Sequence, residues 1–352
     1  MRARLEGPVT AFGGAISIAA HSRGGTRNRK QRHTEMERPV HPLAIDYSPA
    51  AAPDRASDIL AGMISRRCFL GALAAPLVAQ PADPIIDIHQ HTTYSGRSDE
   101  ELIAHQCEMG ITRTVLLPAG SKYGLAAGCS GNDSVVAIAR RLPKEYVFFA
   151  NELPDIAETR PVLEKYLKMG AIGIGEQKFP VDCDSKYIDL VATIAHQHRV
   201  PVLLHFEHEH YNFGIANFHK ILERHRNVTF IGHAQTWWGN ISKNHTQGEM
   251  YPKSPVVPGG ITDRLLSDYP NMFGDMSAGS GLNSMLRDEP HAREFLARHQ
   301  NKLMFGSDCN DRKAGSENCL GVKIIAAIRR LAPGREVERK ILYGNAARLL
   351  KI

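Results

Sequence analysis

The chain has 352 residues, 43% of them hydrophobic and 23% charged, which is the composition of a soluble globular protein with one large α/β domain or two ordinary ones. The formal net charge of +6 belongs mostly to residues 1–80, where 11 Lys and Arg accompany 6 Asp and Glu, whereas the remaining residues hold 32 against 31. The body therefore has no polycationic tract for a phosphate backbone, and we expect no nucleic-acid binding.

Residues 1–62 do not have the pattern of a folded domain. They are rich in Gly, Arg, Pro and Ser and show no sustained apolar period. This composition predicts disorder, and the segment is explained best as an upstream extension of the reading frame before a true start at Met63.

Residues 63–82 resemble a bacterial twin-arginine signal peptide. The S-R-R-x-F-L pattern at Ser65–Leu70 precedes the 11-residue apolar run FLGALAAPLVA, which is shorter than the about 20 residues of a membrane span. We therefore expect an exported, periplasmic or extracytoplasmic protein with no stable membrane span after signal removal. A buried N-terminal helix or a lipid-facing anchor is the alternative.

From residue 83 to residue 352, apolar β-branched runs alternate with amphipathic stretches of helical spacing such as TRPVLEKYLKMG and YIDLVATIAHQHR. The runs are almost continuously hydrophobic, as parallel strands covered on both faces are. The predicted strands are Ile85–His91, Thr112–Pro118, Tyr146–Asn151, Ala171–Lys178, Val200–Glu207, Val228–His233, Met272–Ser277 and Lys302–Asp308.

Eight strands with helices between them in about 270 residues predict an α/β fold of the (β/α)8 TIM-like barrel type. An open doubly wound sheet is the second interpretation, but HQHTTYSGRSDEE after the first strand offers no glycine-rich phosphate loop. The longest irregular connection is expected at residues 237–260. It contains both tryptophans, and Trp237 is a candidate substrate contact, with ordinary packing as the alternative.

Polar side chains end five of the predicted strands, at the edge where barrels of this kind place their active sites. They are His89 and His91 on the first strand, Glu176 and Lys178 on the fourth, His205 and Glu207 on the fifth, His233 on the sixth and Asp308 on the eighth. Histidine and carboxylate are ligands of borderline divalent metals, so the sequence predicts one metal site at this edge.

Strand alternation makes a finer prediction about these side chains. It places His89 and His91 on one face together with Asp87, and Glu176 on the face of Ile172 and Ile174. Asp87 is expected to support the histidines without binding the metal itself.

The six cysteines are widely spaced, with no C-x-x-C pair, so neither a zinc knuckle nor a disulfide framework is indicated. They are Cys68, Cys107, Cys129, Cys183, Cys309 and Cys319. Cys309 follows Asp308, and we expect it to fill space beside a strand end.

H-x-H on the first strand, single histidines on the fifth and sixth, and F-G-S-D on the eighth resemble the amidohydrolase superfamily of metal-dependent hydrolases. The tail ERKILYGNAARLLKI resembles its closing helix. HKILERHRNVTFIGHA and YPNMFGDMSA are similar to its amidohydrolase-related (amidohydrolase 2) branch. The likeness covers residues 84–352 and implies a distorted TIM barrel holding one or two divalent ions, Zn²⁺ first, with Mn²⁺ or Fe²⁺ as alternatives.

The resemblance also implies roles for the strand-end residues. His89 and His91 would hold the deeper metal. His205 and His233 would hold a second metal, or in a mononuclear site one would ligate and the other would polarise the substrate. Asp308 would bind metal or hydrogen-bond its water and accept the proton.

The fourth strand leaves three alternatives open: Glu176 as a bridging ligand, Lys178 as a carboxylated ligand, or neither. If Glu176 ligates, Lys178 is free to receive a substrate carboxylate, and Glu207 is a further candidate substrate contact. Asp275 resembles a common feature of the branch, with hydrogen bonding to a ligand as its expected role.

This ligand set predicts a hydrolase that cleaves an amide, ester, lactone or phosphoester bond in a small-molecule substrate, because a divalent cation activates water and a nearby carboxylate transfers its proton. A metal-dependent decarboxylase of the same branch is one alternative, and it should bind one metal without a fourth-strand ligand. A non-catalytic barrel is the other. A homo-oligomer is left open.

Overall fold

The computed structural model describes residues 83–120, 128–314 and 319–352. All of these residues belong to the compact unit Ser65–Ile352. The expectations for residues 1–62 and for a signal peptide at residues 63–82 lie outside the described residues and stay predictions.

Among the described residues, eight short parallel strands form the centre of this unit, and each lies within one of the predicted ranges. They are β1 (Ile86–Gln90), β2 (Arg113–Leu116), β3 (Tyr146–Phe148), β4 (Ile174–Gln177), β5 (Val202–His205), β6 (Phe230–His233), β7 (Met272–Asp275) and β8 (Leu303–Met304).

The strands form two parallel sheets, β1-β2-β3 and β4-β5-β6-β7-β8. A few backbone hydrogen bonds outside the strand ladders bridge the two seams between them. Ala150 N donates to the Gly173 carbonyl (2.9 Å) after β3, and Ile88 N donates to the Phe305 carbonyl (3.2 Å) beside β8. The strand order and parallel direction confirm the predicted TIM-like barrel, with seams that are less regular than the ladders.

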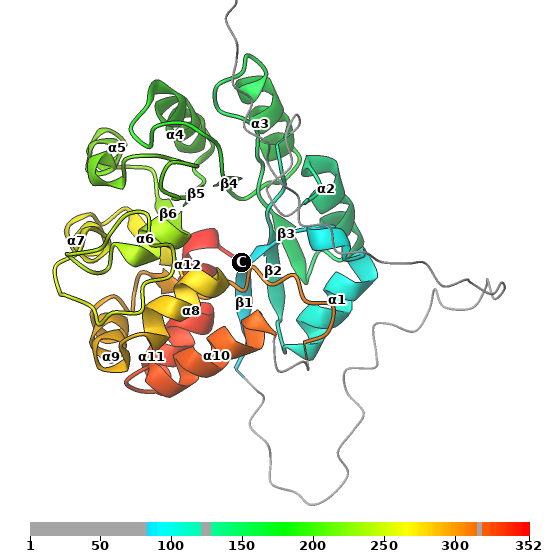
Figure 1. Cartoon of the computed structure of the whole chain (residues 1–352). Helices are drawn as coiled ribbons and strands as arrows, with labels where there is room; N and C mark the ends of the chain where they lie inside the picture. The colour runs from blue at the N-terminus through cyan, green and yellow to red at the C-terminus, as the bar shows by residue number, and fades with distance from the viewer. Residues whose placement is uncertain (1–82, 121–127, 315–318) are drawn as a thin grey trace, which may run out of the picture. The chain divides into compact units, whose positions relative to one another are not determined.

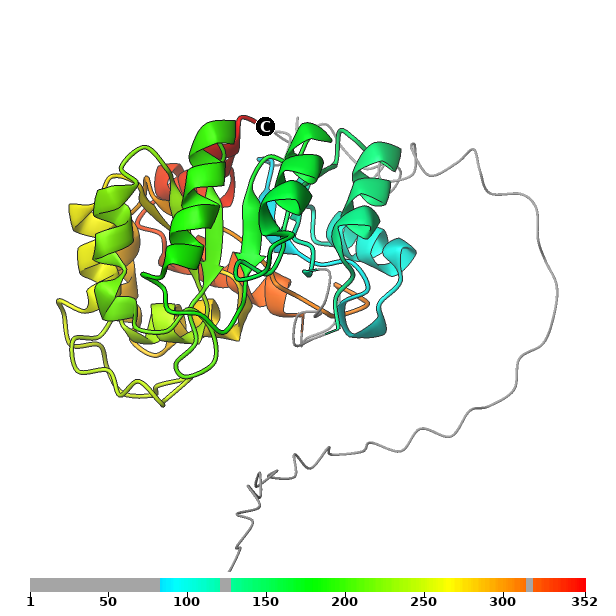
Figure 2. The same cartoon turned by 90° about the horizontal axis from the view of Figure 1, so that it is seen from above.

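Helices follow the strands as the amphipathic pattern predicts. They are α1 (Asp99–Glu108), α2 (Asn132–Arg141), α3 (Thr159–Lys168), α4 (Lys186–His198), α5 (His219–Arg224), α6 (Gln235–Gly239), α7 (Ile261–Asp268), α8 (Ala278–Leu286), α9 (Glu289–Arg298), α10 (Leu320–Leu331), α11 (Arg335–Arg339) and α12 (Asn345–Leu350). Figure 1 shows α1 to α5, α7 and α9 in chain order around the strands, with α12 near the centre, and Figure 2 shows the same arrangement turned by 90°. A capping box starts α1: Ser98 Oγ accepts from Glu101 N (3.2 Å), and the Glu101 carboxylate accepts from Ser98 N (2.8 Å). None of the described helices is both long and apolar enough to cross a membrane.

Two apolar cores hold these layers together. The larger one lies between the strands and the outer helices. The smaller one fills the barrel with strand residues and with α12 from the chain's end; it includes Ile86, Ile88, Val115, Leu117, Phe149, Leu203, Ile231, Met304, Ala346 and Leu350. The C-terminal helix is therefore part of the barrel core, as the resemblance of the tail implies.

Irregularities in β1 and β4 correct the prediction from simple strand alternation. The pairing register shifts between Asp87 and Gln90 in β1, and between Ile174 and Gln177 in β4. Asp87 therefore faces α1 and the β8 loop, where it accepts from Gln106 Nε2 (3.2 Å) and Ser307 Oγ (2.5 Å), and it supports His89 only through that residue's backbone N–H (3.0 Å). Bulges of this kind re-aim side chains at barrel rims.

Alternation also fails in β4. Ile172 packs into the inner core, whereas Ile174 belongs to the outer one, so the two do not share the face of Glu176.

The connection after β6 begins with helix α6 rather than with a loop, and this corrects the expectation for Trp237. Its indole is fully buried and stacks on Phe206 with ring centroids 5.9 Å apart. Trp238 is also buried and donates from Nε1 to the Asp275 carbonyl (2.9 Å). Because both rings are buried in the core, the ordinary-packing alternative holds, and the Trp237 side chain is not exposed to meet a substrate.

Replacing Gly232 tests how tightly Trp237 packs on β6. An added Cβ would lie 2.5 Å from the indole, and overpacking of this kind costs about 1–3 kcal/mol. We expect Gly232→Ala to lower the free energy of unfolding in urea by that amount. At Gly248 no described atom lies within 4 Å of an added Cβ, so Gly248→Ala is the control and should match the wild type. Equal stability of both variants would contradict this packing.

Candidate metal centre

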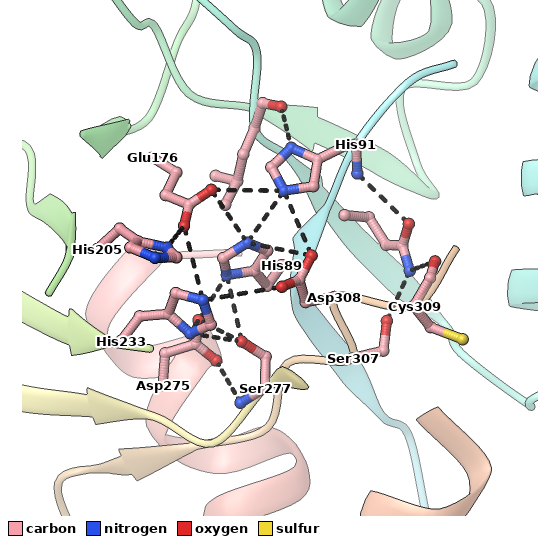
Figure 3. Close-up of polar contacts among 12 residues, drawn as sticks. His89, His91, Glu176, His205, His233, Asp275, Ser277, Ser307, Asp308 and Cys309 are labelled. Carbon is pink, nitrogen blue, oxygen red and sulfur yellow. Dashed lines mark hydrogen bonds and ion pairs between the residues drawn. The ribbon is translucent and has the colours of Figure 1, made fainter. Parts of the chain in front are cut away.

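Three buried histidines are each held by Nδ1, and their Nε2 atoms face one common space (Figure 3). The contacts are His89 Nδ1 to Asp275 Oδ2 (2.6 Å), His91 Nδ1 to the Leu117 carbonyl (2.8 Å) and His233 Nδ1 to Ser277 Oγ (2.9 Å). The Nε2 atoms of His89 and His91 are only 3.1 Å apart. Metal-bound histidines characteristically use the second ring nitrogen for such a supporting contact.

Glu176 lies between two groups of ligands. Its Oε1 is 2.5 Å from His205 Nδ1 and 3.6 Å from His233 Nε2. Its Oε2 is 3.6 Å from His91 Nε2 and 3.7 Å from His89 Nε2. One carboxylate therefore presents one oxygen to each pair of histidines, which is the arrangement of a bridging ligand.

Asp308 completes the first of these groups. Its Oδ1 is 3.5 Å from His91 Nε2 and 3.7 Å from His89 Nε2. This oxygen is buried and has no hydrogen-bond partner among the described residues. A buried carboxylate oxygen without a partner is costly, and a cation among these atoms would remove the cost.

The backbone at Asp308 is held in an uncommon conformation, with φ of 46°. Its N–H donates to the His89 carbonyl (2.9 Å), and the next carbonyl, that of Cys309, accepts from Gln90 Nε2 (3.0 Å) and Arg97 Nη1 (2.9 Å). Left-handed backbone at a non-glycine residue persists where surrounding contacts over-determine it, and such residues cluster at functional sites.

The electrostatics of the site favour cation binding. Burial opposes ionisation of Glu176 and Asp308, but the imidazoles around them hold the pKa of both carboxyls well below the ordinary values. Burial, followed by the charge of His89, lowers the pKa of His233 to about 3, so this ring is neutral. The charges of Asp308 and Asp275 overcome burial and raise the pKa of His89. Positive charge is therefore stabilised among the Nε2 atoms, and the donor set fits one or two divalent cations.

The structure brings together the six residues expected at the strand ends as metal ligands. Ligand atoms of His89, His91 and Asp308 lie within 4.8 Å of one another, and so do those of Glu176, His205 and His233. We call the space that these six residues enclose the mouth.

Lys178 and Glu207 lie beside the mouth but outside both ligand groups. Glu207 Oε2 is 3.0 Å from His205 Nε2. Lys178 Nζ lies 5.4 Å from the Tyr211 ring centroid, and no described carboxylate oxygen lies within 4.0 Å of it. Burial works against the Lys178 charge, but nearby Glu176 and Asp308 raise its pKa, so this side chain is a cation. Of the two fourth-strand side chains, Glu176 and not Lys178 lies in a group of candidate ligand atoms.

Two residues of the site were not identified from the sequence. Ser277 Oγ donates to the Asp275 carboxylate (2.9 Å) and accepts from His233 Nδ1 (2.9 Å), so it links these two side chains. Ser277 belongs to the motif YPNMFGDMSA of the sequence analysis. The Tyr94 ring lies 5.1 Å from that of His91, and the negative charge of Asp308 raises the pKa of its hydroxyl. Tyr94 lies three residues after His91, and this short distance from the H-x-H motif is the sequence feature that points to it.

Residues 125–352 match the amidohydrolase family (Amidohydro_2). The chain belongs to this family, and its barrel is of the amidohydrolase type, which confirms the resemblance seen in the sequence. A comparison with curated proteins found no match.

Similar solved structures support the fold. An uncharacterized TIM-barrel protein from Bordetella bronchiseptica is 15% identical, with 76% of this chain and 98% of that chain covered and a TM-score of 0.54. A probable 2-pyrone-4,6-dicarboxylic acid hydrolase from Acinetobacter baumannii, with citric acid bound, is 14% identical (76% and 99% covered, TM-score 0.54). The 5-carboxyvanillate decarboxylase of Sphingomonas paucimobilis is 11% identical (77% and 100% covered, TM-score 0.52). At these identities the likeness shows the fold alone.

The Asp275 carboxylate gives a direct test of the metal centre. Asp275→Asn keeps the side-chain size but removes the charge that orients His89 and, through Ser277, His233. We expect the affinity for Zn²⁺ to fall about 10–100-fold, the usual effect of losing such a supporting carboxylate. Calorimetric titration of the metal-free protein measures this change.

Asp189→Asn is the matched control, because Asp189 also pairs with a histidine, His225 (2.8 Å), but on the outer helices. It should leave Zn²⁺ affinity unchanged. Wild-type affinity in Asp275→Asn would contradict the proposed support of the ligands.

Proposed function

We propose that this protein is a metal-dependent hydrolase that acts with two divalent cations bridged by Glu176. The observation that carries the proposal is the position of the Glu176 carboxylate, with one oxygen toward His205 and His233 and the other toward His89 and His91. Family membership supports an enzyme, and the ligand set supports the kind of chemistry.

The described residues divide into two candidate ligand sets that share one carboxylate. His89, His91 and Asp308 would hold one ion, His205 and His233 the other, and Glu176 both. When bound, such ions lower the pKa of water from 15.7 to about 7 and polarise a carbonyl or phosphoryl oxygen. We infer Zn²⁺ first, since imidazole and carboxylate donors suit it, with Mn²⁺ or Fe²⁺ as alternatives.

Asp308 is the proposed proton acceptor. Its lowered pKa keeps it ionised at neutral pH. Its Oδ1 has no hydrogen-bond partner among the described residues, so this oxygen is free to accept a proton. A positioned carboxylate that takes a proton from water and returns it to the leaving group contributes roughly 10²–10⁴ in rate. Tyr94 lies on the same side of the mouth and would help to orient the reacting groups.

Lys178 supports a small-molecule substrate with a carboxylate group. Its charge lies beside the mouth without a close carboxylate among the described residues. A cavity of about 570 Å³, large enough for such a molecule, is lined by Glu207, His208 and Thr236 among others, and Glu207 Oε2 lies 3.0 Å from His205 Nε2 of the mouth. The names of two similar structures, a probable pyrone-dicarboxylic acid hydrolase and a carboxyvanillate decarboxylase, both describe carboxylate-bearing compounds.

A metal-dependent decarboxylase is the second candidate, favoured by the same Lys178 charge and by the fold shared with the decarboxylase named above. The bridging position of Glu176 weighs against it, since a decarboxylase should need one metal and no fourth-strand ligand. The two reactions differ in their products. Hydrolysis incorporates labelled oxygen from water into the product, whereas decarboxylation releases carbon dioxide.

Glu176→Gln tests the shared carboxylate. The amide loses the charge that both ligand groups face, so we expect at least one metal equivalent fewer than in the wild type and affinity reduced by more than the roughly 10–100-fold typical of a supporting residue. Elemental analysis and calorimetric titration measure both changes. Glu164→Gln, at a surface carboxylate paired with Arg160 (2.9 Å), is the control. Unchanged metal content in Glu176→Gln would rule out the bridge.

Asp308→Asn tests the proton transfer. We expect kcat on the best substrate of an ester, lactone and amide panel to fall roughly 10²–10⁴-fold, with a much smaller change in KM, because the amide cannot accept the proton. Asp184→Asn, at a surface carboxylate paired with Lys220 (3.1 Å), should keep wild-type kcat. A kcat near wild type in Asp308→Asn would remove Asp308 from the reaction.

A further inference from the structure

A second group of metal-binding side chains lies outside the mouth, between α1 and the segment after β8. His105 of α1, Cys309 and Cys319 are each at most 1% exposed. His105 Nε2 is 3.5 Å from Cys309 Sγ and 3.4 Å from Cys319 Sγ, and the two sulfurs are 3.9 Å apart. We call these three residues the sulfur cluster.

These distances match the edges of a tetrahedral zinc site. With Zn–S of about 2.3 Å and Zn–N of about 2.0–2.1 Å, tetrahedral angles place two sulfurs about 3.8 Å apart and a sulfur and a nitrogen about 3.6 Å apart. The three observed separations agree with these values within about 0.2 Å. The ligand atoms are therefore already spaced to surround one ion.

Asp311 offers a fourth ligand. Its Oδ2 is 3.3 Å from Cys309 Sγ, close to the about 3.5 Å expected between oxygen and sulfur on one zinc ion. The same oxygen accepts from Leu320 N (3.3 Å). It does not belong to the set of ligand atoms that all lie within 4.8 Å of one another, which is that of His105, Cys309 and Cys319. Met109 Sδ also lies 3.9 Å from Cys319 Sγ, but a carboxylate oxygen suits zinc better than a thioether does.

The burial of His105 supports a metal rather than a disulfide. In the described part of the chain the polar contacts of its side chain are those of Nε2 with the two sulfurs. Its Nδ1 has no partner, and a metal at Nε2 would not supply one. Thiols are weak hydrogen-bond partners for a buried imidazole. A Cys309–Cys319 disulfide would leave His105 with still weaker contacts, whereas a cation among the three would satisfy Nε2.

We propose that His105, Cys309 and Cys319 bind one zinc ion in a structural site separate from the mouth, and that Asp311 moves onto the ion as the fourth ligand. Four protein ligands would close the coordination sphere, as in structural rather than catalytic zinc sites. The ion ties α1 to the segment that carries Asp308, because Cys309 is the next residue. The site thus helps to hold the conformation of Asp308 and does not take part in the reaction.

Cobalt substitution of the wild-type protein tests the site without any variant. Protein purified under reducing conditions is stripped with chelator and reloaded with Co²⁺. We expect the near-ultraviolet charge-transfer band of thiolate-bound cobalt, which the histidines and carboxylates of the mouth cannot produce. X-ray absorption of the zinc-loaded protein should show sulfur at about 2.3 Å from the metal. Reduced protein without the band and without sulfur around zinc overturns the proposal.

Cys319→Ser is expected to lose one metal equivalent and the cobalt band, and His105→Gln is a second variant should the first fail to fold. Cys183→Ser is the matched control, because Cys183 is a buried thiol that contacts the Gly214 carbonyl (3.1 Å) instead of the cluster. It should keep the band and the metal content. Glu176→Gln should also keep the band, which separates this site from the mouth. Equal metal content in Cys319→Ser and Cys183→Ser, or a Cys309–Cys319 disulfide whose reduction adds no metal binding, overturns the proposal.

Discussion

The contact on which the mouth depends is that between the buried carboxylate of Asp275 and His89 Nδ1, at 2.6 Å. It decides which nitrogen of His89 faces the other ligands. The same carboxylate accepts from Ser277 Oγ, and that hydroxyl accepts from His233 Nδ1, so ligands on β1 and β6 are oriented from β7. Because Asp275 is fully buried, its charge is little screened by water, and it favours a cation on the far side of both rings.

Three of the six candidate ligands lie where the strands stop being regular, whereas His205 and His233 lie opposite each other in the regular β5–β6 ladder. In β1 and β4 the register shifts next to His89 and Glu176, and Asp308 stands in left-handed backbone after β8. Each irregularity gives up some ladder bonding or adds strain, and each is held by buried contacts such as that of Arg97 with the Cys309 carbonyl. The inner apolar core and α12 are regular by comparison, so stability and ligand placement are divided between two ends of the same strands.

The sequence predicted the eight strands and the polar side chains that meet at their ends, because the apolar runs themselves indicate which segments are buried and how long they are. It did not predict the direction of Asp87, since a one-residue bulge reverses alternation and leaves no mark in hydrophobic pattern. It placed Trp237 in a loop, because no local pattern reports that the indole packs on Gly232. The sulfur cluster was beyond reach: His105 and Cys319 are 214 residues apart, and only the folded barrel brings them together.

Strand β1 connects the mouth with the sulfur cluster. His89 and His91 face the mouth, while Gln90 between them points the other way and donates to Ser307 Oγ (2.6 Å) and to the Cys309 carbonyl (3.0 Å). A shift of the segment after β8 that broke the contacts of Gln90 would therefore move Asp308 relative to both histidines. An ion in the sulfur cluster would hold this segment to α1 and so oppose the shift. Arg97 also opposes it, because its Nη1 donates to the Cys309 carbonyl (2.9 Å). The position of Asp308 therefore depends on Gln90, on Arg97 and on the sulfur cluster, as well as on the residues of the mouth.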